Sequence, residues 1–202
     1  MSKPRSKLRS KTLSSTRFTL KRSNPEIWKR GRIIFITGGV RSGKSRLAVE
    51  MAESYGKNVV FLATCEAKDS EMERRIELHK ESRPKIWQTI EEPLDLASAF
   101  KKIPNTTDAV IVDCLTLLVT NLVLSGKNDD TIIKHIENSV DSIKNSDLTV
   151  IFVTNEVGMG IVPDNELARN FRDTAGKINQ LVARASDEAY LMVSGLKLKL
   201  VP

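Results

Sequence analysis

The stretch GGVRSGKS at residues 38–45 contains residue types that bind phosphate. It fits the pattern of a glycine, any four residues, and then glycine, lysine and serine. Glycines let backbone N–H groups converge on phosphate oxygens, the lysine reaches the β- and γ-phosphates, and the serine hydroxyl suits Mg²⁺. The loop lies between an apolar run and a helical pattern, as this mechanism requires. We therefore predict a P-loop that holds a nucleoside triphosphate with Mg²⁺ through Lys44 and Ser45, rather than an ordinary glycine-rich turn.

Asp113 is the carboxylate that such a loop needs at the end of a neighbouring strand. It directly follows the four apolar residues 109–112. We predict that Asp113 lies on the metal side of the nucleotide together with Ser45. An aspartate that caps the following helix is the alternative interpretation, and the two roles are compatible.

His79 lies in a segment crowded with cations, and it is one of two histidines in the chain. Neighbouring positive charges favour the neutral imidazole, which is the form that attacks phosphorus. A solvated basic helix face that happens to contain a histidine remains the alternative. His135 lies in an amphipathic pattern and is expected to be structural. The cations around His79 are Arg74, Arg75, Lys80, Arg83 and Lys85.

The elements that must position these residues alternate along the chain. Short, nearly continuous apolar runs predict strands buried on both faces, as in a parallel sheet. They lie at 32–37, 58–64, 108–114, 148–154 and 188–194, and the alternating residues 196–202 predict a last edge strand. Helical patterns lie between them at 44–56, 70–82, 93–102, 115–126, 130–145 and 164–186. This order predicts an α/β fold, a single RecA-like P-loop domain over residues 32–202 with a mostly parallel sheet flanked by helices.

The chain from residue 32 onward resembles the bifunctional adenosylcobinamide kinase/adenosylcobinamide-phosphate guanylyltransferase family of cobalamin biosynthesis. Five segments carry the resemblance: 36–53, 61–64, 71–93, 112–123 and 153–195. The stretch TNEVGMGIVP at 154–163, followed by the pattern ARxFRDxAGxxNQ, is far more specific than the P-loop.

The resemblance implies two reactions. A γ-phosphate passes to the hydroxyl of the aminopropanol arm of adenosylcobinamide, and a histidine then takes GMP from GTP and transfers it to adenosylcobinamide phosphate. His79 matches the histidine of the family pattern, and Lys44 is the second catalytic residue expected. Some members carry another histidine just before this one, where the present chain has Leu78. The reactants implied are ATP or GTP, Mg²⁺ and the corrinoid, and the implied assembly is a homotrimer.

The nucleotide contacts implied by the resemblance form three groups. The loop supplies Gly38, Gly39, Val40, Arg41, Ser42, Gly43, Lys44 and Ser45. Later segments supply Thr64, Cys65, Glu66, Lys80, Glu81, Ser82, Arg83, Glu91 and Asp113. Residues 154–165 are expected to form a turn and a helix cap at the same sheet edge, and a wall for the corrinoid or the nucleotide.

The basic charge of the chain is concentrated at its N-terminus. Residues 1–32 hold eleven Lys or Arg and one acid, while the whole chain has a net charge of +7, so the remainder is slightly acidic. Residues 1–31 are predicted to be a disordered basic arm with no inherited role. The favoured interpretation is a solvated tail without a catalytic role. The alternatives are an arm that binds nucleic acid or an anionic surface, a targeting segment, and an accident of the assigned start codon. Two widely spaced cysteines and the lack of a long apolar stretch favour a cytoplasmic protein without a membrane span.

Two other functions fit the P-loop. A simpler kinase of a small hydroxylated metabolite would use the loop, Asp113 and Mg²⁺ without a covalent histidine. A nucleic-acid-associated ATPase would use the basic arm as an electrostatic footprint. The near-neutral body of the chain argues against nucleic acid as a partner.

Overall fold

A computed structural model describes residues 31–66, 70–81 and 83–200. Residues 1–30 of the predicted basic arm, and Ser82, lie outside the described residues. The described residues form one seven-stranded sheet in the order β3-β2-β4-β5-β1-β6-β7. Its strands are β1 (Arg32–Gly38), β2 (Val59–Ala63), β3 (Gln88–Glu91), β4 (Ala109–Asp113), β5 (Thr149–Val153), β6 (Glu188–Val193) and β7 (Leu196–Leu200).

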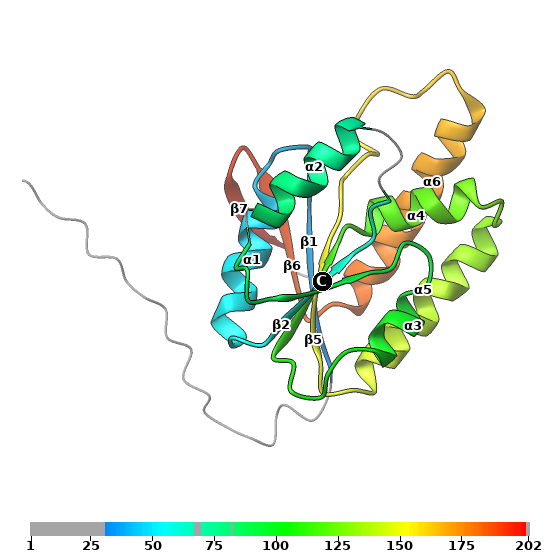
Figure 1. Ribbon diagram of the computed structural model, residues 1–202. Helices are drawn as coiled ribbons and strands as arrows, with labels where there is room; N and C mark the ends of the chain where they lie inside the picture. Colours follow the sequence, from blue (N-terminus) through cyan, green and yellow to red (C-terminus); the bar gives the residue numbers. More distant parts are fainter. Residues whose placement is uncertain (1–30, 67–69, 82, 201–202) are drawn as a thin grey trace, which may run out of the picture.

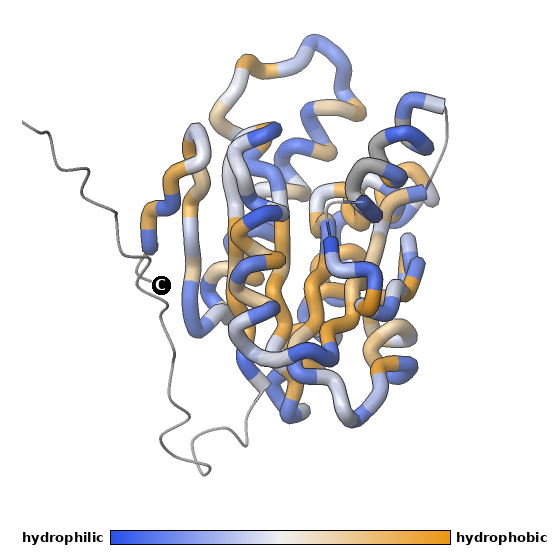
Figure 2. Tube along the Cα trace, turned by 60° about the vertical axis from the view of Figure 1, so that its left-hand side comes forward, coloured by the Kyte–Doolittle hydropathy of each residue, from blue (hydrophilic) through white to orange (hydrophobic). Residues whose placement is uncertain are grey.

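Helices cover both faces of this sheet (Figure 1). They are α1 (Lys44–Tyr55), α2 (Ser70–Glu81), α3 (Leu96–Lys101), α4 (Leu115–Leu124), α5 (Asp129–Lys144) and α6 (Glu166–Ala185). α1 packs against one face, where Leu47, Ala48 and Ala52 join a cluster with strand residues. The buried side chains of α3, α4, α5 and α6 form the larger cluster on the other face. In Figure 2 the most hydrophobic residues accordingly lie along the central strands and the inner sides of the helices.

The predicted parallel sheet is confirmed, with one antiparallel edge. Neighbouring strands from β3 to β6 pair in parallel, and β7 pairs antiparallel to β6. The central strands are buried on both faces, which is why their sequences read as continuous apolar runs. No helix in the described ranges has both the length and the apolar character needed to cross a membrane.

Helix α6 shows where periodicity predicts burial correctly and where it fails. Ala175, Ile178 and Val182 are buried as their spacing predicts, and Phe171 is half-buried. Leu167 lies on the same face but is 51% exposed. It belongs to the first turn of the helix, which extends past the upper edge of the sheet in Figure 1 and has no strand beneath it.

The carboxyl ends of four adjacent strands meet at this upper edge. Ala63 of β2 lies opposite Asp113 of β4, and Asp113 lies opposite Val153 of β5. Ile36 of β1 lies opposite Val153, two residues before the start of the P-loop. In open α/β sheets, ligands bind at this edge.

Candidate nucleotide-binding site

A cavity of about 590 Å³ opens at the carboxyl edge of the sheet beside the P-loop. The predicted residues that line it are residues 40–45, Cys65, Lys80, Arg83 and Asp113. They come from four separate segments of the chain, which the sheet and α2 bring together. The volume suits a ligand of the size of a nucleotide.

The backbone of the P-loop requires glycine at two positions. Gly43 has φ 97°, in the left-handed region, directly before α1 begins at Lys44. Gly38 has φ 149°, and a Cβ there would lie 2.3 Å from the backbone oxygen of Met192. Both constraints place the start of α1, with its unpaired N–H groups, at the cavity. The hydroxyl of Ser42 is buried at the same place and has no hydrogen-bond partner among the described residues.

Lys44 is a buried cation held within the loop. The residue as a whole is 8% exposed, and its Nζ donates to the backbone oxygen of Gly39 at 2.6 Å. Burial lowers the pKa of Lys44, and the nearby Cys114 and Asp113 oppose that shift. A poorly hydrated ammonium group gains most from a polyphosphate, because the charge of the ligand replaces the lost hydration.

Ser45 and Asp113 meet on the other side of the cavity. The Ser45 hydroxyl donates to Oδ2 of Asp113 at 3.1 Å. A hydroxyl and a carboxylate oxygen are the kinds of ligand that Mg²⁺ accepts, with phosphates and water completing its octahedral shell. The two side chains therefore fit a magnesium ion that travels with a nucleotide.

The turn after Asp113 is fixed from beneath by Thr64. The Thr64 hydroxyl donates to the backbone oxygen of Cys114 at 2.7 Å and accepts from its N–H at 2.9 Å. Thr64 is fully buried and does not line the cavity. Burial, reinforced by Asp113, raises the pKa of the Cys114 thiol to about 12, so this cysteine stays a neutral thiol and is a poor nucleophile.

Arg83 brings a second cation to the cavity wall. Its guanidinium lies 3.9 Å from the centre of the Phe61 ring, and Nη2 donates to the Thr89 hydroxyl at 3.1 Å. Burial lowers the pKa of Arg83, and Asp113 and Glu91 oppose that shift. A stacked, hydrogen-bonded guanidinium is suited to the oxygens of a phosphate. Lys80 lies on the rim, where it pairs with Glu91 at 3.1 Å.

Helix α2 crosses this end of the sheet and carries His79 (Figure 1). Ile76 and Lys80 of this helix line the cavity, and His79 lies between them in sequence. The side chain of His79 lies outside the described residues. Its backbone position places it on the helix that borders the cavity.

The remaining predicted contacts lie around the cavity rather than on its wall. Gly38 and Gly39 lead into the loop, while Glu66, Glu81 and Glu91 do not line the cavity. Wall residues that the sequence did not single out include Phe61, Ile76 and Leu117. All three are apolar and look like core residues in the sequence. Asn155 also lines the cavity, and it belongs to the segment 154–165 that was expected to form a wall.

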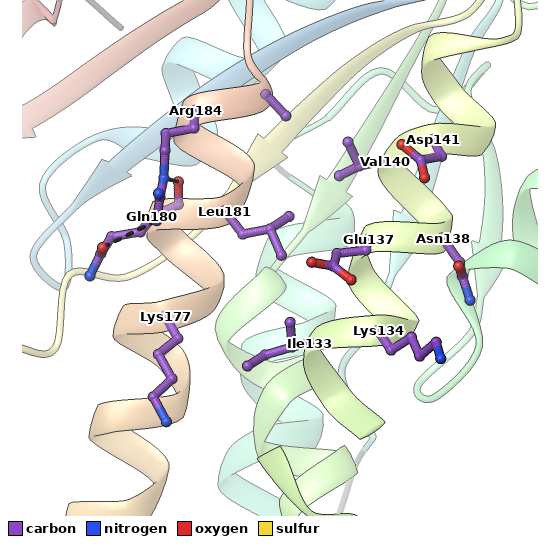
Figure 3. A pocket seen from close by; sticks show the side chains of 11 residues that line it. Ile133, Lys134, Glu137, Asn138, Val140, Asp141, Lys177, Gln180, Leu181 and Arg184 are labelled. Carbon is purple, nitrogen blue, oxygen red and sulfur yellow. Dashed lines mark hydrogen bonds between the residues drawn. The ribbon is translucent and has the colours of Figure 1, made fainter. Parts of the chain in front are cut away.

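A second hollow of about 720 Å³ lies between α5 and α6, on the other face of the sheet (Figure 3). Residues of α5 and α6 alone line it. Glu137 and Asp141 come from α5, and Lys177 and Arg184 from α6 (Figure 3). Among the described residues that line it, none belongs to the P-loop and none is a predicted site residue.

Comparisons with known proteins agree with this geometry. A family model described as cobinamide kinase / cobinamide phosphate guanyltransferase matches residues 34–200. A bifunctional adenosylcobalamin biosynthesis protein CobU of Salmonella typhimurium is 42% identical over 182 residues, covering 83% of this chain and 99% of that protein. A CobP protein of the same description from Pseudomonas aeruginosa is 39% identical, covering 82% of this chain and 95% of that protein.

Among solved structures, an ATPase of the type III secretion system of pathogenic bacteria has a TM-score of 0.53. It is 13% identical, and the match covers 84% of this chain and 57% of the ATPase. At that identity the likeness concerns the fold, and it confirms a RecA-like P-loop architecture.

Proposed function

The chain belongs to the cobinamide kinase / cobinamide phosphate guanyltransferase family, and we propose that the cavity at the sheet edge serves both reactions of this family in turn. The enzyme is a kinase and a guanylyltransferase of cobalamin biosynthesis. The observation that carries the proposal is the convergence of Lys44, Asp113 and Arg83 with helix α2, which bears His79, around one cavity.

In the kinase step, the hydroxyl oxygen of the aminopropanol arm attacks the γ-phosphorus of ATP or GTP. The bond between the γ-phosphorus and the β,γ-bridging oxygen breaks, the nucleoside diphosphate leaves, and the hydroxyl proton passes to solvent. Backbone N–H groups of the loop and Lys44 hold the phosphates in line, and positioning is the main contribution of a protein to this reaction. Mg²⁺, held by Ser45 and Asp113, would neutralise charge on the β- and γ-oxygens.

In the transfer step, an imidazole nitrogen of His79 attacks the α-phosphorus of GTP and pyrophosphate leaves. The phosphate oxygen of adenosylcobinamide phosphate then attacks the same phosphorus, and the imidazole is released. A covalent intermediate divides one difficult displacement into two easier ones. Arg83 and Lys80 both line the cavity, which supports a role for them in stabilising charge on the α-phosphate oxygens.

The test uses the full chain with adenosylcobinamide and two labelled nucleotides. We expect γ-labelled nucleotide to give labelled adenosylcobinamide phosphate, and α-labelled GTP to give first a labelled protein and then labelled adenosylcobinamide-GDP. Label on the protein that is acid-labile and base-stable identifies a histidine phosphoramidate. Phosphorylation without any protein label would favour the simple kinase. Nucleotide hydrolysis stimulated by DNA or RNA, with steep salt dependence, would favour the nucleic-acid-associated ATPase.

We further propose that the loop after β5 is the wall that contacts the corrin ring. It carries three exposed apolar side chains, Met159, Ile161 and Val162, and Leu167 of α6 lies just beyond them. The loop is held in place from α6, because Nη2 of Arg172 donates to the backbone oxygen of Gly158 at 2.8 Å. Its base is joined to the P-loop, since the N–H of Glu156 donates to the backbone oxygen of Gly38 at 3.1 Å.

Replacing Ile161 with aspartate tests this wall. Ile161 is 95% exposed, and its burial against a ligand is worth roughly 1.5–3 kcal/mol, so we expect KM for adenosylcobinamide to rise about tenfold or more. Labelling of the protein by α-labelled GTP should not change. Leu198→Asp, at an exposed apolar position on β7, is the matched control and should leave KM unaltered. An unchanged KM together with a shift in sedimentation would instead place a partner subunit on this loop.

The homotrimer and the cytoplasmic location stay predictions. Sedimentation of the purified chain measures the first, and fractionation of cells measures the second.

A further inference from the structure

Asn155 follows strand β5, which lies between β4 and β1. At Asn155 the pairing with β1 continues, while β4 has already ended. The N–H groups of Thr154 and Glu156 donate to the backbone oxygens of Ile36 and Gly38, at 3.0 and 3.1 Å. The chain therefore continues alongside β1 beyond Val153. In an extended chain, successive residues direct their backbone groups to opposite sides. Those of Asn155 consequently face the side of β4, and β4 has already ended at Asp113.

Two buried side chains take the place of the missing strand. The N–H of Asn155 donates to the Thr116 hydroxyl at 2.7 Å, and its backbone oxygen accepts from Nδ2 of Asn179 at 3.2 Å. Thr116 belongs to α4 and Asn179 to α6, and each is 7% exposed. Both backbone groups of Asn155 are thus held by helices from the face of the sheet opposite α1.

Thr154 joins these contacts into one network, in which the donor and the acceptor of every hydrogen bond can be assigned. The Thr154 hydroxyl donates to Oδ1 of Asn179 at 2.9 Å and lies 3.0 Å from the Thr116 hydroxyl. Since Thr154 gives its proton to Asn179, Thr116 is the donor in the contact between the two hydroxyls. Each hydroxyl then donates its single proton to one acceptor, Thr116 to Thr154 and Thr154 to Asn179. A fully satisfied buried network of this kind holds its members in one geometry.

The side chain of Asn155 lies on the other face, toward the P-loop. Side chains two residues apart in a strand share a face, and Val153 packs in the cluster beneath α1. Asn155 lines the same cavity as Lys44, Ser45 and Asp113. None of the hydrogen bonds between described residues uses its side-chain amide. A rigidly held backbone therefore presents a neutral donor to the cavity.

We propose that Nδ2 of Asn155 donates a hydrogen bond to the γ-phosphate of the bound triphosphate and is a catalytic residue of the kinase step. Thr116, Thr154 and Asn179 are its positioning residues. Strand β5 lies between β4, which carries Asp113, and β1, which leads into the P-loop. These two elements flank the β- and γ-phosphates in a P-loop site, so a residue between them lies at the γ end. The inference rests on the proposed function in one respect, namely that adenosylcobinamide is the molecule that accepts the phosphate. The contact with the γ-phosphate of a bound triphosphate does not depend on that identity.

Asn155→Ala and Asn155→Asp test the role of the amide. The loss of one donor aimed at developing charge costs about a hundredfold or more in kcat, and we expect this loss for phosphorylation of adenosylcobinamide. The aspartate variant keeps the shape, repels the phosphate and should be at least as slow. Labelling of the protein from α-labelled GTP should stay close to wild type, because that reaction occurs at the α-phosphorus.

A binding measurement without corrinoid gives a second readout. We expect the preference for a non-hydrolysable GTP analogue over GDP to fall about tenfold in Asn155→Asp, while the affinity for GDP itself is kept. An unchanged preference, or equal slowing of both reactions, would overturn the assignment. If the wild-type chain does not phosphorylate adenosylcobinamide but Asn155→Asp still loses its preference for the triphosphate, the proposed function fails while the contact of Asn155 with the γ-phosphate stands.

Thr116→Val and Thr116→Ser separate positioning from packing. Valine keeps the shape but removes the hydroxyl that accepts from Asn155, so kinase kcat should fall. Serine keeps the hydroxyl and should restore most of the rate. If the network only stabilises the fold, Thr116→Val will lower the melting temperature and slow the two reactions alike, which would refute the positioning role.

Discussion

Alanine in place of His79 is expected to abolish guanylyl transfer while leaving phosphorylation of adenosylcobinamide in place. Transfer of GMP needs an imidazole to displace pyrophosphate, and alanine offers no nucleophile. The kinase step needs the loop, Lys44 and positioning, but no covalent histidine. We therefore expect no protein label from α-labelled GTP, no adenosylcobinamide-GDP, and a kinase rate of the same order as wild type.

His135→Ala is the matched control, because the chain has two histidines. His135 lies on α5 and does not line the cavity at the sheet edge. Burial lowers the pKa of His135, and its Nε2 has no hydrogen-bond partner among the described residues, as befits a neutral structural side chain. Its replacement should leave the label intact. Label retained by the His79 variant, or mapped to another peptide, would remove His79 from the mechanism.

Lys44→Ala should abolish both reactions together. Its ammonium group is buried beside the backbone oxygen of Gly39. No other lysine among the described residues occupies this place in space, between Gly39 and Asp113. Loss of one charge-assisted contact in a closed site should lower each rate about a hundredfold or more. Equilibrium binding of GTP, the kinase rate and protein labelling would be measured in parallel.

Lys101→Ala serves as the control for Lys44→Ala. Lys101 is exposed in the last turn of α3, on the face of the sheet opposite α1, and its removal should change none of the three readouts. Kinase turnover close to wild type in Lys44→Ala would mean that the loop is not the working site.

The parallel sheet was predictable because its central strands are short, apolar and bounded by turns. β3 was missed, since Gln88–Glu91 is four residues long, half-exposed and polar at three of its four positions, and therefore lacks the apolar run that marks the other strands. Leu167 has the spacing of the buried residues of α6 but is exposed, because periodicity describes a helix face and not where the sheet beneath that face ends.

For the site, spacing alone located the P-loop and Asp113, because strand ends converge at one edge of a parallel sheet. Arg83 and Lys80 came from the family resemblance, and the structure brings both to the cavity. Phe61 could not be found this way, and Asn155 was covered only by the expectation of a wall at 154–165. Their roles depend on contacts with Arg83, Thr116 and Asn179, which lie more than twenty residues away in the chain. The role of His79 stays a prediction.

The cavity beside the P-loop also has a consequence for the timing of the two reactions. If one chamber accepts both the γ-phosphate donor and the guanylyl donor, a molecule that carries GMP on its histidine cannot host a fresh triphosphate in the same place. The two activities then exclude each other at any instant, and the chain alternates between a form that carries GMP and a form that does not. With abundant GTP, the form that carries GMP would accumulate before phosphorylated corrinoid arrives. Transfer of the GMP to the phosphorylated corrinoid would then empty the chamber for the next triphosphate.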